Sequence, residues 1–362
     1  EDLNDIALKL LGRLNICSKE SWVRQYDHEV QGMSVIKPFT GEKNDGPSDA
    51  ALIRPLPDRK EGLIVAHGIL PRYSDIDTYH MTASVIDEAV RSVIATGGKL
   101  DYIAGLDNFC WPDPVQSAET PDGEYKMGQL VRSNQALSDY CKAYKLPCIS
   151  GKDSMKNDYG KGKDKISIPP TLLFTVIAKM DDVEKSVTID AKKSGDLVYV
   201  VGQTRAEMGA SEYYAELGHV GNSIPVVNTN TSIPLYRALT TAIESGFVAS
   251  AHDISDGGLW VTLAETAFAG RLGMELNLET LDCLGDLTAD EKLFSETQSR
   301  LVLTIAPENK AAFEKTLAGN SYSQIGTVCD CGKIVIKDGE NALIDLTIDE
   351  TFSAWHKTVN WD

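Results

Sequence analysis

The sequence lacks the features that mark several large classes of protein. No apolar run is long enough to cross a membrane, no segment has the pattern of a secretory signal, and no internal repeat or low-complexity tract is present. The 35 Lys and Arg are outnumbered by 53 Asp and Glu, giving a net charge of −18. Nucleic acids and anionic membranes require clustered positive charge, so neither is an expected partner. We expect a soluble, cytoplasmic protein.

Cysteine is also sparse and does not form a recognisable framework. The chain has 7 cysteines, an odd number, and no C-x-x-C pair. This usage is typical of a reducing cytosol rather than of a disulfide-bonded secreted domain. The one close pair, Cys329-Asp330-Cys331, has no second ligand pair beside it. It is therefore expected to be a turn with small buried side chains rather than a metal site.

The length and the residue patterns predict two α/β domains. A chain of 362 residues exceeds the size at which a single core stops growing. We expect a first domain at 1–184, a second at 185–362, and a linker in the polar stretch 181–194. Hydrophobic periodicity predicts helices at 3–14, 82–96, 128–144, 207–217, 233–246 and 260–268, and strands at 50–53, 62–66, 101–106, 166–179, 195–202 and 300–305.

The most informative stretch is the sequence AHDISDGGL at 251–259, in which carboxylates precede a glycine pair that opens a helix. Free N–H groups at a helix N-terminus favour an anion, and glycines let a phosphate approach the backbone. Asp253 and Asp256 offer the oxygen ligands that Mg²⁺ prefers. Divalent metal would also let an acidic protein hold a nucleotide. The alternative is a simple Asp or Ser helix cap with a glycine loop.

A second group of residues, SGKDSMKN at 150–157, follows an apolar run. It invites comparison with a phosphate-binding P-loop, but that motif needs Gly where this chain has Leu146, and Ser or Thr where it has Asp153. Any nucleotide here is therefore bound by another geometry. The alternative is a surface turn with two exposed lysines.

Seven short motifs occur in an order that resembles phosphoribosylformylglycinamidine synthase, specifically the second of its two homologous halves. They are RQYDHEVQG (24–32), PSDAA (47–51), DEAVR (87–91), LDNF (106–109), SGKDS (150–154), IPPTLL (168–173) and AHDISDGG (251–258). Each motif is weak alone, but together they span the chain from about Leu8 to Ile336. The wider superfamily includes aminoimidazole ribonucleotide synthase, thiamine monophosphate kinase and selenophosphate synthetase.

The resemblance implies an ATP-dependent ligase of purine biosynthesis that converts formylglycinamide ribonucleotide to formylglycinamidine ribonucleotide. In that family ATP phosphorylates the formamide oxygen, and ammonia from a glutaminase displaces the phosphate. Such a transfer depends mainly on positioning and charge neutralisation. The implied cofactors are ATP or ADP and Mg²⁺, and the implied partners are a ribonucleotide substrate, the first synthase half and a glutaminase.

The resemblance also carries site residues onto this chain. The implied metal ligands are Asp49, Glu88 and Asp253, with Ser92 where the family often has Asn, which puts that contact in doubt. The implied nucleotide or substrate residues are Asp107, Gly151, Lys152, Ser154 and Ser255, where Lys152 replaces a metal-binding Asn of the shorter enzymes. Each has a simpler alternative: Asp87 and Glu88 as a solvated helix face, and Asp107 as a strand-end cap.

No catalytic residue is assigned. The catalytic histidine of the family belongs to a motif in the first half, and the matching segment at 20–27 has no histidine there. His28 and His252 are therefore expected to be non-catalytic. The sequence at 296–300, ETQSR, resembles a substrate-binding Glu-Ser-Gln of the first half, and its role is left open.

The chain is thus expected to be one excised half of a longer synthase, inactive alone. Two alternatives stay open: a structural half whose bound ADP is not turned over, and a free-standing superfamily kinase or synthase acting as a homodimer. The expected fold is two-domain α/β, with a first-domain sheet that pairs with another half to close a barrel. Unpaired sheet edges associate readily, so the isolated chain is expected to form a homodimer.

Overall fold

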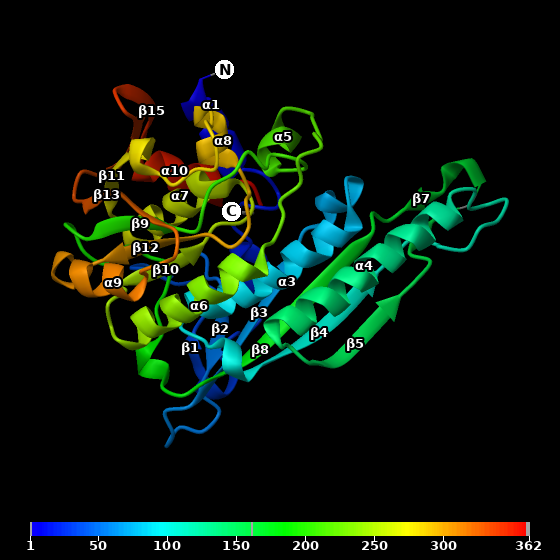
Figure 1. The fold of residues 1–362 in the computed structure, drawn as a ribbon, viewed down its shortest axis with the longest axis horizontal. Helices are drawn as coiled ribbons and strands as arrows, with labels where there is room; N and C mark the ends of the chain where they lie inside the picture. The colour runs from blue at the N-terminus through cyan, green and yellow to red at the C-terminus, as the bar shows by residue number, and fades with distance from the viewer. Residues whose placement is uncertain (1, 161, 360–362) are drawn as a thin grey trace.

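The computed structural model describes residues 2–160 and 162–359 and has a mixed α/β architecture (Figure 1). One sheet has six strands in the order β1-β2-β3-β8-β4-β5, and a second has seven in the order β10-β12-β9-β13-β11-β14-β15. The first sheet is open, with β1 and β5 at its edges. The α/β class is therefore confirmed. The described residues contain no closed barrel, so pairing with another half remains a prediction.

The first sheet and its helices come from the first half of the chain. α3 and α4 lie along one face of this sheet, as Figure 1 shows. The elements of this part of the chain are α1 (Leu3–Leu11), α2 (Glu20–Val23), β1 (Ser34–Ile36), β2 (Ala51–Ile53), β3 (Gly62–Ile69), α3 (Thr78–Ala95), β4 (Ile103–Cys110), α4 (Gly123–Tyr144), β5 (Cys148–Ser154), β6 (Asp158–Tyr159), β7 (Ile166–Ser167) and β8 (Thr171–Met180). β6 and β7 pair with each other in a separate two-stranded sheet.

The second sheet is built by the remainder of the chain. Its elements are β9 (Leu197–Val201), α5 (Glu212–Glu216), α6 (Thr229–Glu244), β10 (Ser250–Asp253), α7 (Gly258–Gly270), β11 (Gly273–Asn277), α8 (Ala289–Phe294), β12 (Leu301–Ile305), α9 (Lys310–Thr316), β13 (Tyr322–Cys329), β14 (Lys333–Asp338), β15 (Asn341–Thr347) and α10 (Ile348–His356). α1 also packs here, against α10 and β15, and Trp260 of α7 donates its indole N–H to the carbonyl of Ala7.

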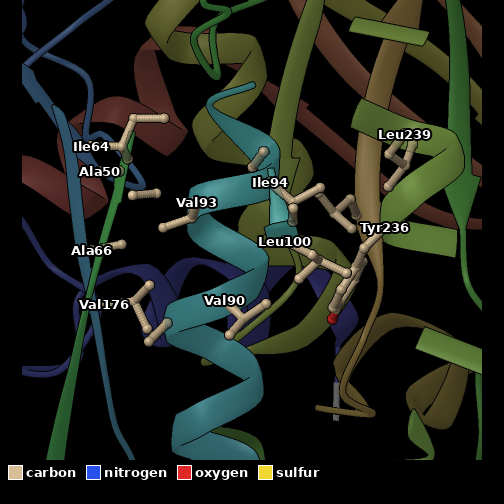
Figure 2. Close-up of a cluster of buried hydrophobic side chains, with 14 of the residues drawn as sticks. Ala50, Ile64, Ala66, Val90, Val93, Ile94, Leu100, Val176, Tyr236 and Leu239 are labelled. Atoms are coloured by element: carbon tan, nitrogen blue, oxygen red, sulfur yellow. The ribbon is translucent and has the colours of Figure 1, made fainter. Parts of the chain in front are cut away.

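α3 is the central helix of the molecule. It begins where the carboxylate of Asp77 accepts from the N–H groups of Tyr79 and His80, and it ends before Gly97, whose φ is 103°. Figure 2 shows its Val93 facing the sheet and its Ile94 facing α6. α3 is therefore buried on both sides, and the core that surrounds it is shared by the two sheets.

Several local expectations need correction. The helix expected at 82–96 starts earlier, at Thr78, because Asp77 caps it. The turn expected at 150–157 is in large part the edge strand β5, because β4 pairs with it in parallel. The helix expected at 260–268 is α7, which begins at Gly258, and every one of its residues is buried.

The Cys329–Cys331 pair also differs from expectation. These two cysteines are joined by a disulfide, and Cys331 is exposed, so they are not small buried thiols. No helix in the described ranges is both long and apolar enough to cross a membrane.

A buried ion pair on α3 joins the two halves of the structure. Asp87 and Arg91 are both completely buried, and their side chains are 2.6 Å apart. Asp87 also accepts hydrogen bonds from the hydroxyls of Tyr144 and Tyr236, at 2.6 and 2.7 Å, and from the backbone N–H of Ser299, at 3.0 Å. One carboxylate thus connects α3, α4, α6 and the loop that precedes β12. The alternative that placed Asp87 on a solvated helix face is wrong.

Replacing Asp87 with Asn should destabilise the protein by about 3–5 kcal/mol, because it leaves the buried Arg91 without one of its charge partners. Urea unfolding followed by fluorescence measures the change. Asp58→Asn, at an exposed position, is the matched control and should unfold like the native chain. Equal midpoints for Asp87→Asn and the control would show that the pair does not hold the domains together.

Candidate functional site

The segment at 250–258 folds as a strand, a loop and a helix. Asp253 is the last residue of β10, Ser255 and Asp256 lie half-buried in the loop, and α7 begins at Gly258. The prediction that a glycine pair opens this helix is confirmed. Both glycines have positive φ, 80° and 69°. A side chain at either would collide with the protein, at 2.3 Å from Val261 in one case.

The N-terminus of α7 is not the open anion site that the sequence suggested. The N–H of Gly257 donates to Oε1 of Glu296 at 2.9 Å, and the N–H of Gly258 donates to the carbonyl of Ser255 at 3.0 Å. A carboxylate of the protein therefore takes the place that a phosphate was expected to take. The glycines serve close packing.

Asp49 and Asp253 meet although 204 positions separate them. The N–H of Asp253 donates to Oδ2 of Asp49 at 3.1 Å, and His252 Nδ1 lies 2.7 Å from Oδ1 of Asp49. One ligand atom from each of Asp49, His252 and Asp253 lies within 4.8 Å of the other two. In the described part of the chain, no other three His, Cys, Asp or Glu residues form such a group.

His252 is held between two carboxylates. Its Nε2 lies 2.7 Å from Oε2 of Glu265, on the side opposite Asp49. Burial opposes a charge on the ring, but the two carboxylates outweigh it and raise the pKa of His252 well above its ordinary value. His252 is therefore a buried imidazolium that neutralises Asp49, and it is not free to act as a metal ligand. His28, in contrast, lies beside Glu29, at 4.0 Å.

Glu88 of α3 faces the end of β3. Its Oε2 accepts from the N–H of Ile69 at 3.0 Å, and a Cβ on Gly68 would lie only 2.8 Å from that oxygen. Burial, followed by the charge of Asp253, raises the pKa of Glu88 to about 8. Asp253 lies close by, because Arg91, three residues after Glu88 on α3, contacts the Asp253 carboxylate. Ser92, one turn later, donates its hydroxyl to the carbonyl of Glu88 at 2.9 Å.

Arg91 connects this carboxylate group to the domain junction. Its Nε donates to Oδ2 of Asp253 at 3.2 Å, and one terminal nitrogen donates to Oε1 of Gln298 at 3.0 Å. Sequence reasoning did not assign a role to Arg91. Its place one turn after Asp87, as a charge in an otherwise apolar helix segment, is the signal that could have indicated a buried partner.

A second group of acids lies at the mouth of a cavity of about 170 Å³ between the domains. Asp256 and Glu212 line the cavity together with Arg72 and Tyr73. Burial, then the charge of Glu296, raises the pKa of Asp256 well above its ordinary value. Sequence reasoning singled out Asp256 but missed Glu212, because Glu212 comes from α5 and reaches the cavity only in the folded chain.

Asp107, Gly151, Lys152 and Ser154 lie together on the neighbouring strands β4 and β5. Asp107 pairs with Gly151, and any Cβ at 151 would lie 2.9 Å from the Asp107 carboxylate. Lys152 donates to the hydroxyl of Ser154. Burial raises the pKa of Asp107, which is half-buried.

The carboxylate group around Glu88 and the group of Asp107, Gly151, Lys152 and Ser154 lie along one row of the first sheet. Gly68, Phe174, Asp107 and Gly151 are direct neighbours on β3, β8, β4 and β5. Glu88, at Gly68, is thus about three strand spacings, roughly 15 Å, from Gly151. The predicted residues therefore form two groups, with carboxylates near the domain junction and Asp107 with the β5 residues at the sheet edge.

The network around Glu296 predicts a dependence of stability on pH. Oε1 of Glu296 also accepts from the N–H of Glu212, and Oε2 accepts from the hydroxyl of Tyr73, both at 2.8 Å. Burial nevertheless dominates and raises the pKa of Glu296 from 4.5 to about 7. The folded state therefore holds this proton more tightly than the unfolded chain, and the free energy of unfolding falls as the pH rises through this interval.

Glu296→Gln removes this proton equilibrium while keeping the shape of the side chain. We expect the native chain to lose up to about 3 kcal/mol relative to the variant as the pH rises from about 5 to about 8. Urea unfolding of both proteins across this range measures it. If the difference in the free energy of unfolding between the native chain and Glu296→Gln did not change with pH, the raised pKa of Glu296 would be contradicted.

Comparison with known proteins identifies both parts of the chain. Residues 47–179 match the model of the AIR synthase related protein N-terminal domain, and residues 193–339 match that of the C-terminal domain. The chain is 33% identical to phosphoribosylformylglycinamidine synthase subunit PurL of Thermoplasma volcanium and 34% identical to that of Alkaliphilus metalliredigens, over 98% of its length in both cases. It spans 44% and 45% of these two relatives, which is less than half of each.

Solved structures agree at the level of the fold. Thermotoga maritima PurL complexed with FGAR has a TM-score of 0.74 at 16% identity, over 99% of this chain and 54% of that one. The complex described as AaThiL with AMPPCP and TMP has a TM-score of 0.55 at 16% identity, over 82% of this chain and 90% of that one. With both of its domains matched in order, this chain belongs to the AIR synthase related protein family.

Proposed function

We propose that this chain is one half, the second, of the synthase unit of phosphoribosylformylglycinamidine synthase, and that it holds a magnesium-bound adenine nucleotide. The observation that carries the proposal is the meeting of Asp49 and Asp253 beside Glu88, since these were the three metal ligands that the family motifs implied. The PurL relatives support the purine pathway, and they are longer than this chain, so the complete reaction would need further parts.

The charges of the carboxylate group fit a divalent cation. His252 and Arg91 already neutralise Asp49 and Asp253, but Glu88 has no ion pair in the described residues, and burial, followed by the charge of Asp253, raises its pKa. Mg²⁺ favours carboxylate oxygens and shares its remaining positions with water and phosphate. Glu88, Asp49 and Asp253 would hold it, with Ser92 near the first of them.

The sheet edge would hold the remainder of the nucleotide. We assign its contacts to Asp107, Gly151, Lys152 and Ser154, about three strands from Glu88 in the same row. Gly151 lets the carboxylate of Asp107 lie close to the backbone of β5, and Lys152 supplies a positive charge in an acidic chain. Solved relatives described as T. maritima PurL complexed with ATP and with ADP support a nucleotide of this kind.

The chemistry assigned to these residues is positioning. When bound, Mg²⁺ would neutralise phosphate charge as it develops during phosphoryl transfer. Arg91 and His252 fix the orientation of Asp253 and Asp49, so these carboxylates do not rearrange when a ligand binds. Ser255, in the loop at the domain junction, would contact the ligand from the second domain. We place the chain in the cytoplasm, with five of its cysteines free and Cys329 joined to Cys331.

The proposed partners are the first synthase half and a glutaminase that supplies ammonia, and the substrate is formylglycinamide ribonucleotide. The solved structure described as PurLQS from Thermotoga maritima supports a multi-part assembly. The open edge of β5 and exposed apolar side chains on the sheet, including Val65 and Ile149, would pair with the other half to close a barrel. In its absence a second copy of this chain would take that place, giving a homodimer.

Two alternatives place the same residues in other roles. In the first, the chain is a structural half whose ADP is never turned over. The hydrogen bonds that Asp253 and Glu296 accept from the protein favour the structural half, because they give these carboxylates a role in holding the fold. In the second, the chain is a free-standing kinase or synthase of the superfamily. The match to nearly all of the AaThiL chain favours that alternative.

Asp253→Asn should abolish the stabilisation that ADP and Mg²⁺ give to the native chain, which is about 2.7 kcal/mol at a hundredfold excess over Kd. An amide binds Mg²⁺ far more weakly than a carboxylate. Thermal unfolding with and without ligand measures the shift. Glu88→Gln, which breaks no ion pair among the described residues, should also lose it, and Asp58→Asn should keep it. If both site variants kept the full ligand-induced shift in unfolding temperature, Asp253 and Glu88 would not be the metal ligands.

The isolated chain should form no amidine product from formylglycinamide ribonucleotide, ATP, Mg²⁺ and ammonium, because it carries the nucleotide residues but no assigned catalytic residue. Adding the separately expressed first half should restore product, measured by mass spectrometry. Rapid ammonia-dependent turnover by the chain alone would favour the free-standing enzyme. ADP that co-purifies and does not exchange, with activity restored only by the first half, would identify the structural half.

A further inference from the structure

Two thiols meet where α4 ends and the edge strand β5 begins. Sγ of Cys141, in the last turn of α4, lies 3.7 Å from Sγ of Cys148, the first residue of β5. The turn between them is fixed. Lys145 takes a left-handed conformation, with φ 56°, and the N–H of Leu146 donates to the carbonyl of Cys141 at 2.8 Å. The two sulfur atoms are therefore held in van der Waals contact.

The pair is reachable from solvent. Cys148 is exposed, Cys141 is half-buried like Cys110 and Cys283, and Cys17 is buried. A metal is a poor explanation for the contact. In the described chain the only three-residue group with metal-ligand spacing is the one around Asp49, so the two sulfurs lack a third ligand.

The surroundings keep both groups as thiols at neutral pH. Burial raises the pKa of Cys141 and that of Cys148. The neighbouring Cys148 raises the pKa of Cys141 further, and the carboxylate of Asp107 has a smaller effect on both. A thiolate is the reactive form of cysteine, so the raised pKa slows oxidation at neutral pH. A strong oxidant or a higher pH is needed to oxidise either sulfur. Once one sulfur is oxidised, its partner is already in position to resolve it.

We propose that Cys141 and Cys148 are a redox-responsive pair that closes to a disulfide under a peroxide oxidant. One thiolate attacks hydrogen peroxide and becomes a sulfenic acid with release of water. The second thiol then displaces a second water to form the S–S bond. Two thiols are oxidised and one peroxide is reduced to two waters. The bond ties the end of α4 to β5, three residues before Gly151.

Peptide mapping tests this directly. The chain is treated with hydrogen peroxide, alkylated under denaturing conditions and digested with trypsin, which cleaves after Lys142, Lys145 and Lys152. We expect peptides 133–142 and 146–152 as one cross-linked species that has lost two hydrogen atoms, and a free-thiol count lower by two. Cys148→Ser should abolish the species, and Cys110→Ser, at another half-buried cysteine, should retain it.

Two results would overturn the proposal: Cys148 oxidised beyond sulfenic acid with Cys141 still free, or a cross-link to a different cysteine. Stability gives an independent readout, since a closed loop restricts the unfolded chain. Peroxide should raise the unfolding temperature of the native chain and of Cys110→Ser but not of Cys148→Ser. If peroxide left the unfolding temperature of the native chain unchanged, a disulfide that restrains β5 would be contradicted. Neither readout involves a nucleotide, so failure here is distinct from failure of the proposed function.

Discussion

The buried pair of Asp87 and Arg91 is the constraint on which the rest of the structure depends. A carboxylate and a guanidinium that are both withdrawn from water are tolerated only when their remaining hydrogen-bonding capacity is satisfied. Asp87 meets this condition by accepting from two tyrosines and Ser299, which come from other parts of the fold. Arg91 meets it in part: its Nε donates to Asp253 and one terminal nitrogen donates to Asp87 and Gln298, while the other has no hydrogen-bond partner among the described residues. The same bonds that join the two sheets therefore also set the position of the carboxylate at the centre of the candidate site.

Around this pair the chain concentrates more negative charge than it neutralises. Glu88, Asp253, Asp256 and Glu296 all have raised pKa values, with burial as the largest cause. His252 and Arg91 are already paired with Asp49, Glu265, Asp87 and Asp253, and Glu88 has no ion pair among the described residues. Buried acids of this kind weaken the fold, and they persist where function requires them. A bound cation would relieve the repulsion, which is the physical link between this charge distribution and a metal-nucleotide role.

The first sheet contributes to the candidate site through its exposed edge strand, β5. β5 is an edge strand whose residues are almost all exposed, yet it carries three of the residues assigned to the nucleotide and one of the paired thiols. An edge of this kind invites pairing with another strand. The chain spans 44% of one PurL relative, and we propose that the remainder of a longer protein would pair with this edge. The proposed association, ligand contacts and thiol chemistry thus all involve one strand.

Local sequence determined the secondary structure well where a single physical signal dominates. Periodic apolar residues gave the buried helix α3, and a glycine pair gave the start of α7, because both signals act within a few residues. The contact of Asp49 with Asp253 was reached only through family resemblance, since 204 positions separate them. Tertiary structure alone decided that Glu296 fills the α7 N-terminus, that His252 is charged between two acids, and that 150–154 is a strand. Each of these depends on a partner brought from a distant segment, and no local pattern encodes which partner arrives.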